Sequence, residues 1–136
     1  ARNPFSAAPH ERTQRELVEV SERNRLIAEP YTKYLVARDL VNQAAAVLLT
    51  SVQNARRLGV DESRWVFLHG QADLRERNLF DRISLGEAPS APMAVRHALE
   101  VAGVGVADVS YFDFYSCFPI AVSNITDALR IRAGSR

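Results

Sequence analysis

Apolar residues gather in short stretches along this 136-residue chain, separated by polar connectors. Continuous apolar runs, rich in β-branched and aromatic residues or alanine, predict buried strands at 42–50, 65–69 and 109–114. The alanine-rich run at 42–50 leaves a buried helix as an alternative. Apolar residues at helical spacing predict helices near 91–102 and 119–131. Strands alternating with helices predict an α/β fold with a largely parallel sheet and covering helices.

Capping residues predict where the helices begin and end. Thr13 with Glu16 three residues later is a capping box for a short helix. Ser51 and Ser90 stand before helical patterns, where a side-chain oxygen can accept from a free backbone N–H. Gly103 follows the helix near 91–102, in the position where a left-handed residue commonly ends a helix.

The segment 71–87 differs from its surroundings, because it is charged and shows little periodicity. A segment of this length in a compact domain is either a functional loop or a mobile one. The two prolines within residues 1–9 indicate a loop or tail. We expect a loop and short helix over 1–30 and one α/β domain over 31–136.

Composition restricts the classes of function. The net charge of +1 gives no reason to expect nucleic acid or an anionic membrane as partner. Sixteen of the seventeen basic residues are arginine, a bias that favours genome composition over a binding surface. No apolar run is long enough to span a membrane, and the N-terminal stretch has no signal-peptide core.

The cysteine and histidine pattern restricts the chemistry further. A single cysteine, Cys117, excludes an internal disulfide and a cysteine-rich metal site. His10, His69 and His97 lack the spacing of metal ligands, so no metal site is expected. A reducing cytoplasm is the expected location.

The best candidate site is the polar corner Tyr115-Ser116-Cys117 with Phe118, which follows the run at 109–114. Pro119 suits the first turn of the next helix. Ligands collect at the carboxyl ends of strands in open α/β sheets, and this corner is predicted at such an end. We therefore expect the binding site here.

Each candidate also has a structural reading. Cys117 near a helix N-terminus is a possible nucleophile, although burial as a small apolar side chain is favoured. Tyr115 is either an active-site donor or an aromatic residue at a strand end. His69 is expected at the same edge as Tyr115, although a structural histidine is favoured. Asp113, predicted inside a strand, is expected to pair with a backbone N–H or an arginine.

Three stretches resemble the thiolase superfamily, over residues 27 to 132 together. Asn42-Gln-Ala-Ala-Ala-Val, with the short helix ending in Leu58-Gly59, is similar to the thiolase pattern Asn-Asp-Gly-Ala-Ala-Ala-Val. The stretch 92–103 resembles the helix that follows, and 108–118 resembles the next strand with its terminal Asn-Glu-Ala-Phe box. That box is His-Asp-Cys-Phe in sterol-carrier-protein-type thiolases. It is commonly Tyr-Ser-Cys-Phe-Pro in actinobacterial acetyl-CoA acetyltransferase-like proteins, as it is here.

The resemblance implies a partial thiolase fold and roles for several residues. The box borders the acyl-CoA pocket, and its first residue helps to hold a water of an oxyanion hole. That role carries onto Tyr115, with Ser116 and Cys117 beside it as catalytic candidates and Phe118 against the substrate. Residues 1–30 correspond to a remnant of the covering loop. Tyr31 and Lys33 then either contact coenzyme A or lie in a solvated loop.

The resemblance also implies what is missing. The Gly-His-Pro and Cys-x-Gly boxes and the acylated N-terminal cysteine do not occur in this sequence. We therefore expect a fragment of an acyl-CoA acyltransferase of lipid or steroid metabolism that is inactive alone. Coenzyme A thioester would be its substrate, and no cofactor is expected. The partner would be a second copy or a complementary thiolase-like chain.

Two other readings remain. The chain is alternatively a non-catalytic thiolase-like subunit that completes a partner's acyl-CoA site. A free-standing cysteine hydrolase would instead require His69 within hydrogen-bond reach of Cys117. By this reasoning, the lack of a strand at 109–114 would argue against the thiolase resemblance.

Overall fold

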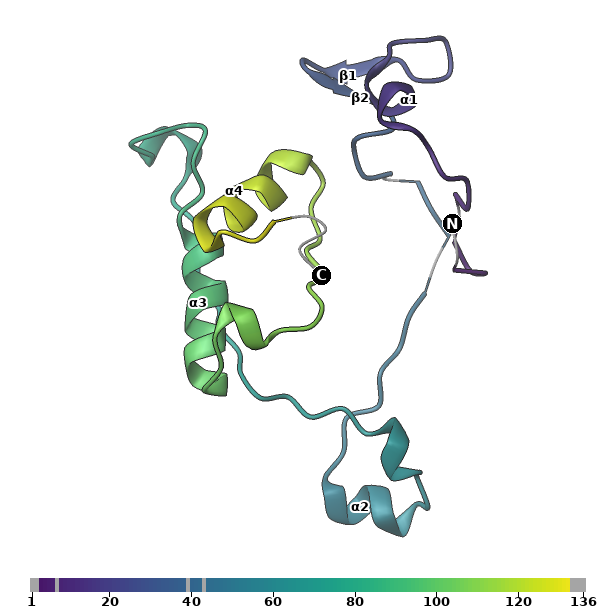
Figure 1. Cartoon of the computed structure of the whole chain (residues 1–136), viewed down its shortest axis with the longest axis vertical. Helices are drawn as coiled ribbons and strands as arrows, with labels where there is room; N and C mark the ends of the chain where they lie inside the picture. Colours follow the sequence, from purple (N-terminus) through teal and green to yellow (C-terminus); the bar gives the residue numbers. More distant parts are fainter. Residues whose placement is uncertain (1–2, 7, 39, 43, 133–136) are drawn as a thin grey trace.

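The computed structural model describes residues 3–6, 8–38, 40–42 and 44–132. Its elements in chain order are α1 (Gln14–Val18), β1 (Leu26–Ala28), β2 (Tyr31–Thr32), α2 (Val52–Arg57), α3 (Ser90–Ala102) and α4 (Pro119–Leu129). Short 3-10 turns lie at Glu62–Arg64, Leu79–Asp81 and Val106–Asp108. Figure 1 shows these elements spread along an open path, with α1 and α2 at opposite ends of the long axis.

The N-terminal unit joins α1 to the hairpin β1–β2 through a buried asparagine. Asn24 is only 1% exposed. Its amide nitrogen donates to the carbonyls of Glu16 at 3.0 Å, Leu17 at 3.2 Å and Glu19 at 2.9 Å. Its amide oxygen accepts from the backbone N–H of Tyr34 at 2.9 Å. A buried amide with its hydrogen bonds satisfied fixes the end of α1 against the strand that follows.

Short helices α1 and α2 begin where the capping residues predict. Thr13 and Glu16 form the complete capping box at the start of α1. The Ser51 side chain accepts from the N–H of Asn54 at the start of α2, at 3.2 Å. Gly59, with φ of +66°, follows this helix in the left-handed conformation that glycine adopts without steric cost.

Helices α3 and α4 pack against each other, as Figure 1 shows. The predicted apolar stripe of α3 is half-buried, at Val95, Ala98, Leu99 and Ala102. Arg96 fastens the pair by donating to the carbonyl of Ala128 near the end of α4, at 2.6 Å. Gly103 ends α3 with φ of +71°, as expected.

The predicted cap of α3 is wrong. Ser90 is the first helical residue, and Pro89 occupies the cap position without a side-chain hydrogen bond. The N–H and hydroxyl of Ser90 both donate to the carboxylate of Glu76, at 3.1 and 2.6 Å. A carboxylate at a helix N-terminus satisfies a free N–H and interacts favourably with the helix dipole. The loop before α3 thus supplies the cap.

The expectation of a largely parallel sheet is not confirmed. The sheet of the described residues has two antiparallel strands, β1 and β2, joined through a cis Glu29–Pro30 peptide bond. Within the described residues, 44–50, 65–69 and 109–114 contain no strand. A strand requires backbone hydrogen bonds to a neighbouring segment, and these runs do not pair with one another. The alternative of a helix at 42–50 fails as well, since 44–50 has no helical residues.

One of these unpaired segments packs closely on α3. Gly70 follows the run at 65–69, and a Cβ built on it would overlap the carbonyl oxygen of Ala98. It would also lie 2.9 Å from the nitrogen of Ala102. Glycine at this position therefore permits the backbone to approach the last turns of α3.

The chain exposes far more surface than a compact protein of its size. The accessible surface is 12120 Å², whereas a folded protein of this mass exposes about 7,100 Å². Among the described residues, the buried apolar side chains are Ala55, Pro92 and Leu129. No helix in the described part of the chain is long and apolar enough to cross a membrane.

Candidate functional site

The corner at Tyr115–Phe118 starts helix α4. The Ser116 hydroxyl accepts from the N–H of Phe118 at 3.0 Å and also donates to the carbonyl of Phe118. This pattern fixes the backbone immediately before Pro119, the first residue of α4. Ser116 therefore holds the turn, and Tyr115 and Cys117 project beside it.

Tyr115 and Cys117 contact each other. The Tyr115 hydroxyl lies 3.7 Å from the Cys117 sulfur, at hydrogen-bond distance for sulfur. Both side chains are exposed, Tyr115 by 81%. The hydrogen bond to Cys117, followed by its charge when ionised and by desolvation, raises the pKa of Tyr115. A phenol is protonated at neutral pH in any case, so Tyr115 can act as a hydrogen-bond donor.

The N-terminal unit is joined to this corner by two contacts. The N–H of Ala37 donates to the carbonyl of Cys117 at 3.0 Å. The rings of Tyr31 and Phe118 lie with their centroids 5.3 Å apart and their planes inclined by 54°. A tilted aromatic pair of this kind is attractive. The structure therefore brings Tyr31, Cys117 and Phe118 together, although 80 residues or more separate Ala37 and Tyr31 from the corner.

Lys33 lies in a cavity of the same N-terminal unit. The cavity has a volume of about 300 Å³. Its described lining includes His10, Arg12, Lys33 and Arg38, together with Ala8, Leu17, Tyr34 and Val36. The Arg12 guanidinium stacks on the ring of Tyr34, 3.7 Å from its centroid. Its described lining is basic and aromatic and contains no acidic residue, so it suits an anionic ligand.

His69 and Asp113 do not have the geometry that the sequence predicted for them. His69 was predicted to meet Tyr115 at one edge of a sheet, but neither 65–69 nor 109–114 is a strand in the described structure. That argument for their proximity is wrong, and a role for His69 stays a prediction. Asp113 is exposed, so the burial that predicted a paired carboxylate is also wrong.

Sequence reasoning missed three of the basic residues around Lys33. His10, Arg12 and Arg38 stand in polar segments without regular periodicity. Because the excess of arginine over lysine was attributed to genome composition, Arg12 and Arg38 were not considered as ligand-binding residues. The available signal was that Lys33, Tyr34 and Arg38 stand within six residues of one another.

Comparison with known proteins provides a solved structure similar to this chain. The crystal structure of a monomeric SCP2-thiolase like protein type 1 from Mycobacterium smegmatis matches with 48% sequence identity and a TM-score of 0.86. The match covers 96% of this chain and 28% of that chain, so this chain spans little more than a quarter of that protein's length. No model of a protein family matches, and no curated protein matches.

The match contradicts the argument that a thiolase-like chain must have a strand at 109–114. The lack of a strand at 109–114 would have argued against a thiolase, yet the chain path still superimposes on a thiolase-like structure. Hydrogen-bonded pairing needs a neighbouring strand, whereas the path of one segment does not. On the evidence of identity and superposition together, the chain belongs to the thiolase-like superfamily.

Proposed function

We propose that this chain is part of a thiolase-like acyltransferase acting on acyl-CoA thioesters, within lipid or steroid metabolism. The observation that carries the proposal is the basic cavity at Lys33 on the unit that also contacts the Tyr115–Cys117 corner. The arginine and lysine side chains suit the phosphates of coenzyme A. The corner contacts that unit through the Tyr31–Phe118 pair. The thioester end of the substrate would lie at the corner.

In this proposal Tyr31 and the four residues of the corner each have a role. Tyr115 donates a hydrogen bond to an oxygen that gains negative charge during acyl transfer. Ser116 holds the turn through the backbone of Phe118. Cys117 contacts the Tyr115 hydroxyl, and Phe118 with Tyr31 forms an apolar wall. The acylated nucleophile and the base belong to the remainder of the protein, so this chain alone performs no acyl transfer.

Binding of coenzyme A tests the proposal without requiring activity. We expect the double variant K33Q/R38Q to weaken binding of coenzyme A by about tenfold or more, because charge-assisted contacts to phosphate are lost. Arg64→Gln is the control. It removes one positive charge from a residue outside the cavity lining and should change binding little. Isothermal titration calorimetry measures both. Equal binding by the wild type and the double variant would refute the phosphate assignment.

A second function is favoured by the exposed surface. The chain exposes 12120 Å², far above the value of about 7,100 Å² for a compact protein. A non-catalytic subunit that completes a partner's acyl-CoA site would present such a surface to a complementary thiolase-like chain. A neighbouring gene encoding the nucleophile and the two missing boxes would favour this function. One longer reading frame containing them would favour the first.

A further inference from the structure

A second cavity lies on the charged segment before α3, away from the corner and the basic cavity. Its volume is about 420 Å³, within the range of roughly 300–1,000 Å³ usual for small-molecule sites. Its described lining comprises Leu74, Arg75, Glu76, Arg77, Arg82, Ile83, Ser84, Glu87, Pro89, Ser90 and Met93. Three arginines against two glutamates give this lining a net charge of +1.

The two glutamates do not contribute equally to the potential in the cavity. Glu76 accepts hydrogen bonds from the N–H and hydroxyl of Ser90 and from the N–H of Arg77. The positive end of the α3 dipole offsets part of the negative charge of Glu76. Glu87 is the other carboxylate in the lining. The arginines therefore determine the sign of the cavity.

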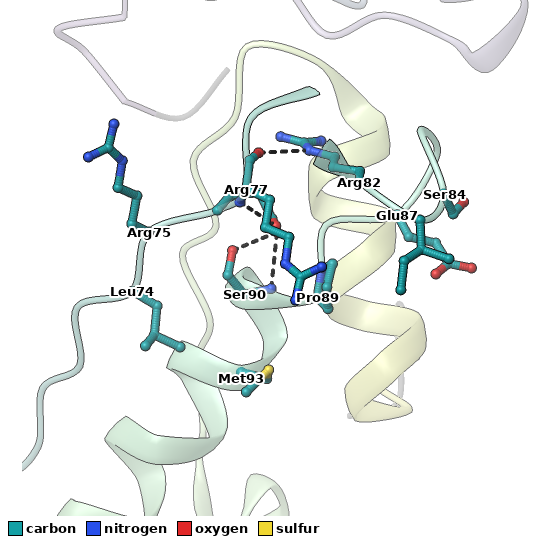
Figure 2. Close-up of a pocket in the computed structure, with 11 residues that line it drawn as sticks. Leu74, Arg75, Arg77, Arg82, Ser84, Glu87, Pro89, Ser90 and Met93 are labelled. Atoms are coloured by element: carbon teal, nitrogen blue, oxygen red, sulfur yellow. Dashed lines mark hydrogen bonds between the residues drawn. The ribbon is translucent and has the colours of Figure 1, made fainter. Parts of the chain in front are cut away.

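Arg77 and Arg82 are available for a ligand. The ion pairs of the described residues are made by Arg15, Arg56 and His97, so no described carboxylate forms a direct ion pair with Arg77 or Arg82. The charge of Arg82 still acts on Glu76, since it is among the causes that lower the pKa of that carboxyl. Arg82 is half-buried and donates through Nε to the carbonyl of Arg77 at 3.1 Å. Figure 2 shows the Arg77 side chain extending past Ser90 toward Pro89, whereas Arg75 extends away from them.

The rest of the wall is apolar. Leu74, Ile83, Pro89 and Met93 line the cavity, and Ile83 is 98% exposed. An exposed isoleucine beside two guanidinium groups that make no direct ion pair suits a ligand that has both a hydrocarbon part and a negative charge. The planar fork of arginine fits the two oxygens of a carboxylate.

We propose that this cavity binds a small amphipathic carboxylate, with its carboxylate on Arg77 and Arg82 and its hydrocarbon chain against Ile83 and Met93. The proposal does not depend on the proposed function, because its residues are absent from the lining of the basic cavity. A medium-chain acyl carboxylate such as octanoate has this chemistry. An inorganic anion has the charge alone and would leave the apolar wall uncovered.

Titration with sodium octanoate, followed by NMR of the backbone amides, tests the site. We expect shifts at residues 74–93, and the double variant R77Q/R82Q should weaken binding at least tenfold. The double variant R57Q/R64Q is the matched control, because it removes the same number of positive charges from residues outside the cavity lining. Coenzyme A binding by R77Q/R82Q should stay as in the wild type, which separates failure here from failure of the proposed function.

A second variant distinguishes the hydrocarbon contact from the charge. Ile83→Ser changes an exposed side chain, so it should leave the fold intact and weaken octanoate binding severalfold. Acetate and inorganic phosphate should bind more weakly than octanoate to the wild type. Equal loss in R57Q/R64Q and R77Q/R82Q, or octanoate shifts spread over the whole chain, would overturn the proposal. Phosphate binding as strong as octanoate, unaffected by Ile83→Ser, would overturn it as well.

Discussion

At the scale of single residues, the Tyr115–Cys117 contact has a measurable electrostatic consequence. The pKa of Tyr115 is raised first by its hydrogen bond to Cys117, then by the charge of that group and by desolvation. Cys117→Ala removes the first two causes, so the pKa of Tyr115 should fall toward its ordinary value of 10.0. An NMR titration of the tyrosine ring carbons measures the change.

Ser116→Ala is the matched control for that measurement. The Ser116 hydroxyl contacts the backbone of Phe118 and not the phenol, so the pKa of Tyr115 should stay as in the wild type. A Tyr115 pKa that is unchanged in Cys117→Ala would show that the 3.7 Å contact does not form in solution.

Glu76 is the second residue with a clear electrostatic consequence. Hydrogen bonds from the Ser90 side chain, then from the N–H groups of Arg77 and Ser90, lower its pKa from the ordinary 4.5. A carboxylate with a lowered pKa in the folded chain stabilises its contact above the ordinary pKa. That stabilisation is lost as the pH falls through the lowered value.

The start of α3 should therefore open in acid. We expect the protection of the Ser90 amide, measured against the intrinsic exchange rate at the same pH, to fall once Glu76 is protonated. The variant Glu76→Ala, which has no acceptor oxygen, should show low protection already at neutral pH. Amide exchange followed by NMR checks both. Glu87→Ala, in the same loop, is the control. Identical Ser90 protection in wild type and Glu76→Ala would contradict the cap.

At the scale of elements, Gly70 controls how the chain lies on α3. An added methyl group would overlap the carbonyl oxygen of Ala98 and lie 2.9 Å from the nitrogen of Ala102. These are backbone atoms, so the segment must move away. We expect Gly70→Ala to destabilise this packing by about 1–3 kcal/mol, as overpacking does.

Gly86→Ala is the matched control, because an added Cβ at Gly86 meets no atom within 4 Å. Thermal unfolding followed by the helical circular dichroism signal compares the two variants. Equal stability of Gly70→Ala and Gly86→Ala would mean that the 65–70 segment does not lie on α3 in solution.

The helices were predictable from the sequence, and the strands were not. The spacing of Val95, Ala98, Leu99 and Ala102 identifies α3 because a helix makes its hydrogen bonds within one segment. The composition of a run such as 109–114 indicates only that its side chains suit burial. Whether it becomes a strand depends on a partner segment, which its own residues do not specify.

The candidate site also has a local part that the sequence predicts and long-range contacts that it does not. Tyr115, Cys117 and Phe118 were identifiable because their corner is local, lying between an apolar run and Pro119. The contact of Tyr31 with Phe118 was not identifiable as a pair, since it depends on how a distant hairpin returns to the corner. Glu76 as the cap of Ser90, from 14 residues upstream, was missed for the same reason.

At the scale of the whole molecule, apolar surface is the dominant feature. Val47, Leu49 and Val66 are each exposed by 87% or more, in the segments 44–50 and 65–69 that have no strand partners. Stable monomers rarely expose contiguous apolar patches above a few hundred Å². Extended segments with unpaired backbone also invite pairing with another chain.

We therefore predict that the isolated chain associates with itself, although the similar solved protein, of which it spans 28%, is described as monomeric. Sedimentation velocity across a dilution series should show a mass above 15.2 kDa that falls on dilution. An apolar dye should bind to the diluted chain. The double variant V47S/L49S should associate less, because it removes two of the most exposed apolar side chains. A mass of one chain at every concentration, without dye binding, would show that these segments cover one another in solution.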